Sequence, residues 1–105
     1  MAWIRHAIQW TPGAEADLLD AAEQAFPEVA IAIRAAMKLY ARKGEGDARD
    51  PMTAGPWRGR SRLRPDGIAT EYRVIFKRFP MQALIRVERV RLRSVVYNDP
   101  PARSH

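Results

Sequence analysis

The sequence predicts an α+β fold: an N-terminal strand, a helical hairpin, and a three-stranded antiparallel meander that completes one twisted sheet, with the helices on one face. Three observations support this prediction. Apolar residues recur at helical spacing up to position 43, strand-like alternation follows from position 57, and turn-forming residues separate these runs. With 105 residues, 47% of them hydrophobic, the chain has the size and composition of a single globular domain spanning 1–105.

The first strand is predicted from Trp3 to Trp10, where apolar and polar residues alternate. Thr11 is a suitable N-cap, and Pro12 suits the first helical position, where a backbone N–H would have no partner. A helix is therefore expected from there to Phe26. Its apolar stripe consists of Ala14, Leu18, Leu19, Ala22, Ala25 and Phe26.

A second helix is predicted from Pro27 to about Lys43, because Pro27 interrupts the first helix and Gly44 is a typical C-terminal cap. The side chains expected to be buried are Val29, Ile33, Ala36, Met37 and Tyr40. From Gly44 to Pro56 the composition shifts to glycine, aspartate, proline and threonine, so no regular structure is expected there.

Three strands are predicted to follow, at Trp57–Arg64, Thr70–Phe79 and Ala83–Arg93. Turn residues fall between them at 65–67 and 80–82, so the three strands should form an antiparallel meander. The first strand is expected to join the same sheet.

Charge is distributed unevenly along the chain. Residues 1–57 carry six lysines and arginines against eight acidic residues, whereas residues 58–93 carry eleven against three. Such clustering favours a polyanionic partner, because each neutralised phosphate releases condensed counterions. A basic surface that is simply solvated is the alternative that composition alone leaves open.

The arginines of the first meander strand recur at every second residue, so they should share one face of that strand. They are Arg58, Arg60, Arg62 and Arg64. Arg89, Arg91 and Arg93 repeat the spacing in the last strand. Planar guanidinium groups suit bidentate binding of phosphate, although charged edge strands that discourage aggregation would show the same spacing.

The middle strand should have one core face, made of Tyr72, Val74 and Phe76. Arg73 and Lys77 then project from the opposite face, where Arg73 should lie beside Arg62. Alternatively, Arg73 is a cross-strand partner for Glu88 or Glu71. Tyr97 follows the last strand, where a tyrosine can pack on the surface or stack on a base.

Other kinds of chemistry find little support in the sequence. The chain has no cysteine, which excludes disulfides, thiolate nucleophiles and cysteine metal sites. Neither His6 nor His105 is expected to be catalytic, and no metal or cofactor is expected. No apolar run is long enough to span a membrane, so a cytoplasmic location is expected.

Three motifs together resemble the RelE/ParE toxins of type II toxin–antitoxin systems. They are the basic strand Arg60–Arg64, the segment Glu71–Phe76, and Arg91 through Tyr97, which stand in the family's order and spacing. For the RelE branch, the resemblance implies an mRNA endonuclease that enters the ribosomal A site. There the 2′-hydroxyl group attacks the neighbouring phosphate.

The resemblance also implies roles for five residues. Arg60 and Arg62 match the family's two basic strand residues, Arg73 and Arg91 match phosphate-clamping arginines, and Tyr97 matches the catalytic tyrosine. This branch often has lysines at the first two positions, and arginine cannot act as a general base near neutral pH, so Tyr97 is the best proton carrier. Further phosphate contacts are expected from Arg58, Arg64, Arg89, Arg93 and Lys77.

Two other functions remain open at this stage. The ParE branch shares the fold but inhibits DNA gyrase by binding it, and a basic sheet can also bind nucleic acid without catalysis. Besides the ribosome and mRNA, or gyrase, the expected partner is a cognate antitoxin whose acidic segment covers the basic sheet.

Overall fold

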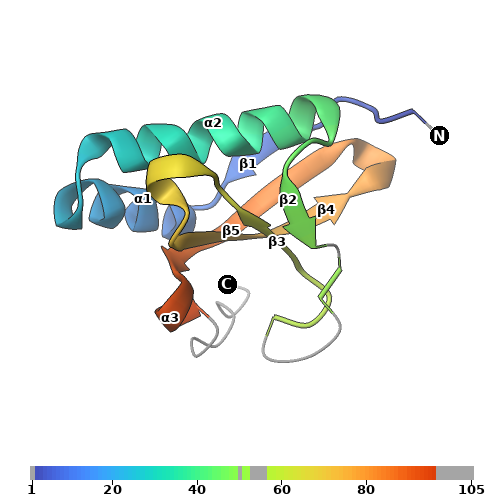
Figure 1. Cartoon of the computed structure of the whole chain (residues 1–105). Coiled ribbons are helices and arrows are strands. Elements are labelled where there is room, and N and C mark those ends of the chain that lie inside the picture. Colours follow the sequence, from blue (N-terminus) through green and yellow to red (C-terminus); the bar gives the residue numbers. More distant parts are fainter. Residues whose placement is uncertain (1, 50, 53–56, 97–105) are drawn as a thin grey trace.

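The structure, a computed structural model, describes residues 2–49, 51–52 and 57–96, and shows a mixed sheet packed against a helical hairpin (Figure 1). In these residues the sheet has five strands in the order β1-β5-β4-β3-β2. The elements are β1 (Ala7–Trp10), α1 (Pro12–Gln24), α2 (Pro27–Lys43), β2 (Asp47–Arg49), β3 (Ser61–Arg64), η1 (Gly67–Ala69), β4 (Tyr72–Phe79), η2 (Pro80–Gln82), β5 (Leu84–Leu92) and α3 (Arg93–Val96). The predicted α+β class is confirmed.

Both predicted helix starts and the end of α2 are confirmed. The Ala14 N–H donates a 3.1 Å hydrogen bond to Thr11 Oγ, the N-cap of α1. At the other end of the hairpin, α2 stops at Gly44, which has a φ of 71° and donates its N–H to Tyr40 O at 2.8 Å. A Cβ at Gly44 would also lie 2.7 Å from the Trp3 ring. Both the positive φ and this close contact therefore favour glycine at the position.

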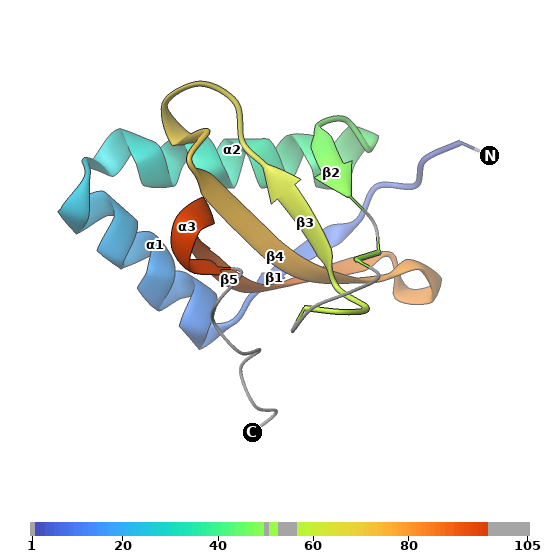
Figure 2. The ribbon, with the colours of Figure 1, turned by 60° about the horizontal axis from the view of Figure 1, so that its bottom comes forward.

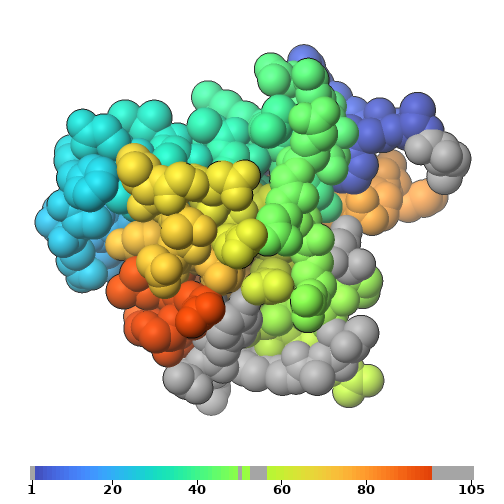
Figure 3. All heavy atoms as spheres, viewed as in Figure 1, coloured from blue at the N-terminus to red at the C-terminus, as the bar shows by residue number. Residues whose placement is uncertain are grey.

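The helices cover one face of the sheet and form the main core with it (Figure 2). The segment around η1 packs beneath α2, where its yellow atoms adjoin the helix in Figure 3. The largest fully buried side chains of this core are Val29, Ile33, Met37, Leu63, Val74, Phe76, Ile85, Val87 and Val90. No helix among the described residues is long and apolar enough to cross a membrane.

The predicted apolar stripe of α1 is partly wrong. Leu19 is 61% exposed and Phe26 is 45% exposed, whereas Asp17 faces the sheet. The reason is a hydrogen bond of 2.8 Å from the Val90 N–H to Asp17 Oδ2, which turns that side of α1 toward β5. The side chains of α1 that are buried are Ala14, Asp17, Leu18 and Ala21.

The first strand joins the sheet as expected, but only from Ala7, and it runs parallel to β5 with Ala7 opposite Leu84. The antiparallel order of β3, β4 and β5 is also confirmed. Single turns of 3-10 helix, η1 and η2, form the two connections, and β4 and β5 begin one or two residues later than predicted.

The absence of regular structure expected between Gly44 and Pro56 is wrong, because β2 pairs antiparallel with β3. Asp47 lies opposite Arg64 and Arg49 opposite Arg62. A polar edge strand of three residues is too short to show alternation in the sequence.

The predicted ladder of four arginines is wrong as well. Arg58 and Arg60 precede β3, because Gly59 adopts a φ of 85° and the backbone turns there. Arg93 likewise lies outside β5, as the first residue of α3. The arginines that lie within β3 are therefore Arg62 and Arg64.

Candidate nucleic-acid interface

The sheet face opposite the helices, called the open face below, carries the arginines of β3 and β4. Because Val74 points into the main core, its neighbours Arg73 and Ile75 project from the open face. The register sets Arg62 opposite Ile75 and Arg91 opposite Arg73. The first two motifs thus lie side by side on the sheet, and Arg91 of the third lies in the strand next to them.

A cavity of about 470 Å³ lies on this face, and the described residues that line it are four arginines and one aspartate. We call it the arginine cavity, and its residues are Asp47, Arg62, Arg64, Arg73 and Arg93. Asp47 Oδ2 lies 2.8 Å from Arg64 Nε, but both side chains are more than 40% exposed, so water screens this pair. Among the described residues, four guanidinium groups face one carboxylate, and this excess of positive charge suits an anion.

Arg73 is the most enclosed of the four arginines, with 5% of its surface exposed. One terminal nitrogen donates hydrogen bonds to Thr70 O at 2.7 Å and Tyr72 O at 2.8 Å, which fix the guanidinium group. Its Nε is buried and has no hydrogen-bond partner among the described residues. The guanidinium group is thus held in one position at the cavity, where its positive charge favours an anion.

Two of the predicted phosphate ligands instead bind carboxylates of this chain. Arg60 Nε donates to Glu88 Oε1 at 2.8 Å. Arg89 Nε lies 3.0 Å from Asp17 Oδ2, so it ties α1 to β5. Neither arginine lines the arginine cavity.

The remaining predicted residues are dispersed. Arg91 lines a separate hollow of about 160 Å³ beside α1, together with Asp17 and other residues. Lys77 Nζ lies 5.5 Å from the centroid of the Phe79 ring, and Arg58 is exposed in the turn before β3. Tyr97 lies outside the described residues.

The open face also carries an apolar cluster that was not predicted from the sequence. Trp57 and Ile75 are both 0% exposed, and Met52 packs against them; we call these three residues the Trp57 cluster. Ile75 was the available signal, since it is an apolar residue on an otherwise basic side of β4. The Trp57 cluster borders the arginine cavity, because Arg62 lies directly opposite Ile75.

Asp17 is the other residue that sequence reasoning did not single out. Burial raises the pKa of its carboxyl group, against the opposing effects of the Val90 hydrogen bond and of Arg89. β1 pairs with β5 only as far as Val87. Beyond that point the Asp17 carboxylate takes the place of a neighbouring strand and accepts the Val90 N–H of β5. Among the described residues, no three histidine or acidic side chains gather as a metal-binding group.

Comparisons with known proteins bear on the fold. No family model matches the chain, and no curated protein matches it significantly. Solved structures do match: a chain of the toxin–antitoxin complex RelBE2 from Mycobacterium tuberculosis has a TM-score of 0.66 at 17% identity, over 87% of this chain and 94% of that one. YafQ from E. coli has a TM-score of 0.63 at 14% identity, over 88% of this chain and 98% of YafQ. The chain therefore has the RelE-like fold that its sequence motifs indicated.

Proposed function

We propose that this chain is the toxin of a type II toxin–antitoxin system and cleaves mRNA on the ribosome by attack of a 2′-hydroxyl group on the adjacent phosphate. The observation that carries the proposal is the arginine cavity, in which the buried Arg73 lies with Arg62, Arg64 and Arg93 on a RelE-like fold. The target would be cytoplasmic, since translating ribosomes are.

The cavity residues can supply binding and charge stabilisation. Their guanidinium groups would hold the scissile phosphate and stabilise the negative charge that grows on its oxygens during attack. None of them can take the proton from the 2′-hydroxyl group, because arginine stays protonated. As the 2′-oxygen attacks phosphorus, the bond from phosphorus to the 5′-oxygen breaks, which leaves a 2′,3′-cyclic phosphate and a 5′-hydroxyl group. The 2′-hydroxyl group gives up a proton and the leaving 5′-oxygen takes one. We assign this proton transfer to Tyr97, and alignment of the hydroxyl with the phosphate to the ribosome.

An antitoxin is the proposed protein partner. Charge complementarity supports it, since an acidic segment laid across the open face would bind the same arginines as the RNA. The likeness to a chain taken from a toxin–antitoxin complex agrees with this partner.

The test is a translating-ribosome assay with primer extension to locate mRNA ends. The intact chain should cut the message, and Arg73→Lys, Arg62→Gln and Tyr97→Phe should each slow cleavage at least tenfold. Arg73→Lys keeps the charge but removes the guanidinium group that Thr70 O and Tyr72 O hold in place, so it separates a positioned cation from simple attraction.

Arg58→Gln is the matched control, because Arg58 carries the same charge but does not line the cavity. It should leave cleavage within about twofold of the intact chain. Intact message in every reaction would contradict the nuclease and leave gyrase inhibition, or RNA binding without cleavage, as the function to test next.

A further inference from the structure

Glu88 occupies an irregular position in β5. Ile75 pairs with Arg89 and Phe76 pairs with Val87, so the register shifts and Glu88 has no partner residue in β4. This is a β-bulge, and bulges commonly redirect a side chain out of the regular alternation of a strand.

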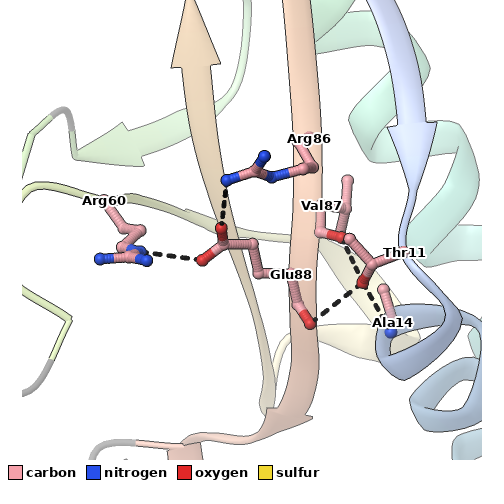
Figure 4. A network of polar contacts seen from close by, with 6 residues as sticks. All are labelled: Thr11, Ala14, Arg60, Arg86, Val87 and Glu88. Atoms are coloured by element: carbon pink, nitrogen blue, oxygen red, sulfur yellow. Dashed lines mark hydrogen bonds and ion pairs between the residues drawn. The ribbon is translucent and has the colours of Figure 1, made fainter. Parts of the chain in front are cut away.

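The carboxylate of Glu88 binds two arginines (Figure 4). Oε1 accepts from Arg60 Nε at 2.8 Å and Oε2 accepts from a terminal nitrogen of Arg86 at 3.1 Å. The side chain of Glu88 is only 11% exposed, so water screens these pairs less than those on the surface.

The bulge is also held from the side of α1. Thr11 Oγ donates to Val87 O at 2.9 Å and lies 3.4 Å from Glu88 O, while it caps α1 through the Ala14 N–H (Figure 4). The backbone of Glu88 is therefore fixed, and its carboxylate is a fixed anchor for Arg60.

Arg60 in turn closes the segment that carries Trp57. The Met52 N–H donates to Arg60 O at 2.6 Å, the Gly59 N–H donates to Met52 O at 2.9 Å, and the Arg60 N–H donates to Trp57 O at 3.0 Å. These bonds hold Trp57 on Ile75, in the cluster that borders the arginine cavity.

We propose that Glu88 is a positioning residue for the RNA cleavage proposed above: acting through Arg60, it holds the Trp57 cluster against Ile75 and so fixes the place of Arg62 in the cavity. The inference rests on the proposed function. It also gives Arg60 a different role from Arg62, since Arg60 anchors the cavity wall and does not bind the phosphate.

The negative charge of Glu88 allows a positioning role to be distinguished from a role in RNA binding. A carboxylate near a phosphate site opposes RNA binding, so its removal should not weaken binding. Loss of position should slow the reaction, because small misplacement of a catalytic group is costly. Glu88→Gln should therefore lower kcat at least tenfold, while the Kd for a single-stranded RNA oligonucleotide stays equal or falls. A purely structural defect would weaken both.

Arg60→Gln should reproduce the loss of kcat, and the double variant should be no slower than either single one, because both changes break the same contact. Glu23→Gln is the control: it removes the same charge from an exposed position on α1 and should leave kcat unchanged. Amide exchange measured by NMR should rise at Gly59 and Arg60 in Glu88→Gln, and stay slow at Val74 in β4.

Equal kcat for the intact chain and Glu88→Gln would overturn the role of Glu88 and leave the nuclease standing. A weaker Kd in Glu88→Gln, or additive losses in the double variant, would overturn it too. Absence of cleavage by the intact chain would overturn the proposed function itself, and the positioning role of Glu88 with it.

Discussion

The two faces of β4 are both buried near its start, yet in different ways. Tyr72, Val74 and Phe76 are covered by the helices and share one large apolar core. On the open face, Arg73 is buried by carbonyl groups that accept its hydrogen bonds, and Ile75 by Trp57. Packing on the helix face of β4 is thus shared among many apolar contacts, whereas burial on the open face comes from a few specific contacts. The predictions below test this contrast.

The largest effect is expected in the main core. Phe76→Ala should lower the free energy of unfolding by about 3–5 kcal/mol, because it leaves a cavity among well-packed side chains. Trp57→Ala should lower it by only about 1–3 kcal/mol, since the smaller Trp57 cluster can detach while the rest stays folded. Urea denaturation measures both. Equal losses would mean that the Trp57 cluster belongs to the main core.

A smaller effect is expected in RNA binding. Arg62→Gln should reduce the slope of log K against log salt concentration by about 0.7, the contribution of one phosphate contact on a single strand. Arg60→Gln should leave the slope unchanged, because the guanidinium of Arg60 is already bound to Glu88. Fluorescence titrations of a labelled oligonucleotide at several salt concentrations measure both slopes. Equal slopes for the two variants would show that Arg60 and Arg62 contribute alike to RNA binding.

The smallest effect is expected in the pH dependence of stability, through Asp17 at the contact between α1 and β5. Since burial raises the pKa of Asp17, the folded state holds this proton more tightly than the unfolded chain does. Its contribution to stability is therefore greatest below the unfolded pKa, near 3.8, and declines as pH rises through the folded value. Relative to Asp17→Asn, the intact chain should lose stability over that pH interval in denaturation experiments. The opposite slope would show that the ion pair with Arg89 outweighs burial.

The same contrast explains what the sequence could and could not reveal. The helices and the meander were predictable, because apolar periodicity is dense there and Thr11, Pro12 and Gly44 mark helix ends by local chemistry. The open face was predicted less well. The alternate arginines before and after Gly59 look like one strand, but the positive φ of that glycine ends the pattern.

Partners distant in the sequence were beyond local reasoning. Arg60 and Glu88 are 28 residues apart, and only the β-bulge brings the carboxylate to the guanidinium. Sequence spacing therefore identified a set of arginines whose role in binding stays a prediction. It could not tell that Arg62 and Arg73 line the cavity while Arg60 and Arg89 are held by carboxylates.

The position of β5 also governs how the chain can be assembled. This strand lies between β1 and β4, although among the described residues β5 is the last strand in sequence and β1 is the first. The helical hairpin can form from local contacts, but the sheet cannot close until Leu84–Leu92 has been synthesised. Until then β1 and β4 each lack a neighbour, and unpaired strand edges invite aggregation. A chain that stopped before Leu84 would thus leave β1 without its partner and β4 as an edge strand, so Arg73 of the arginine cavity would lie at an unpaired edge.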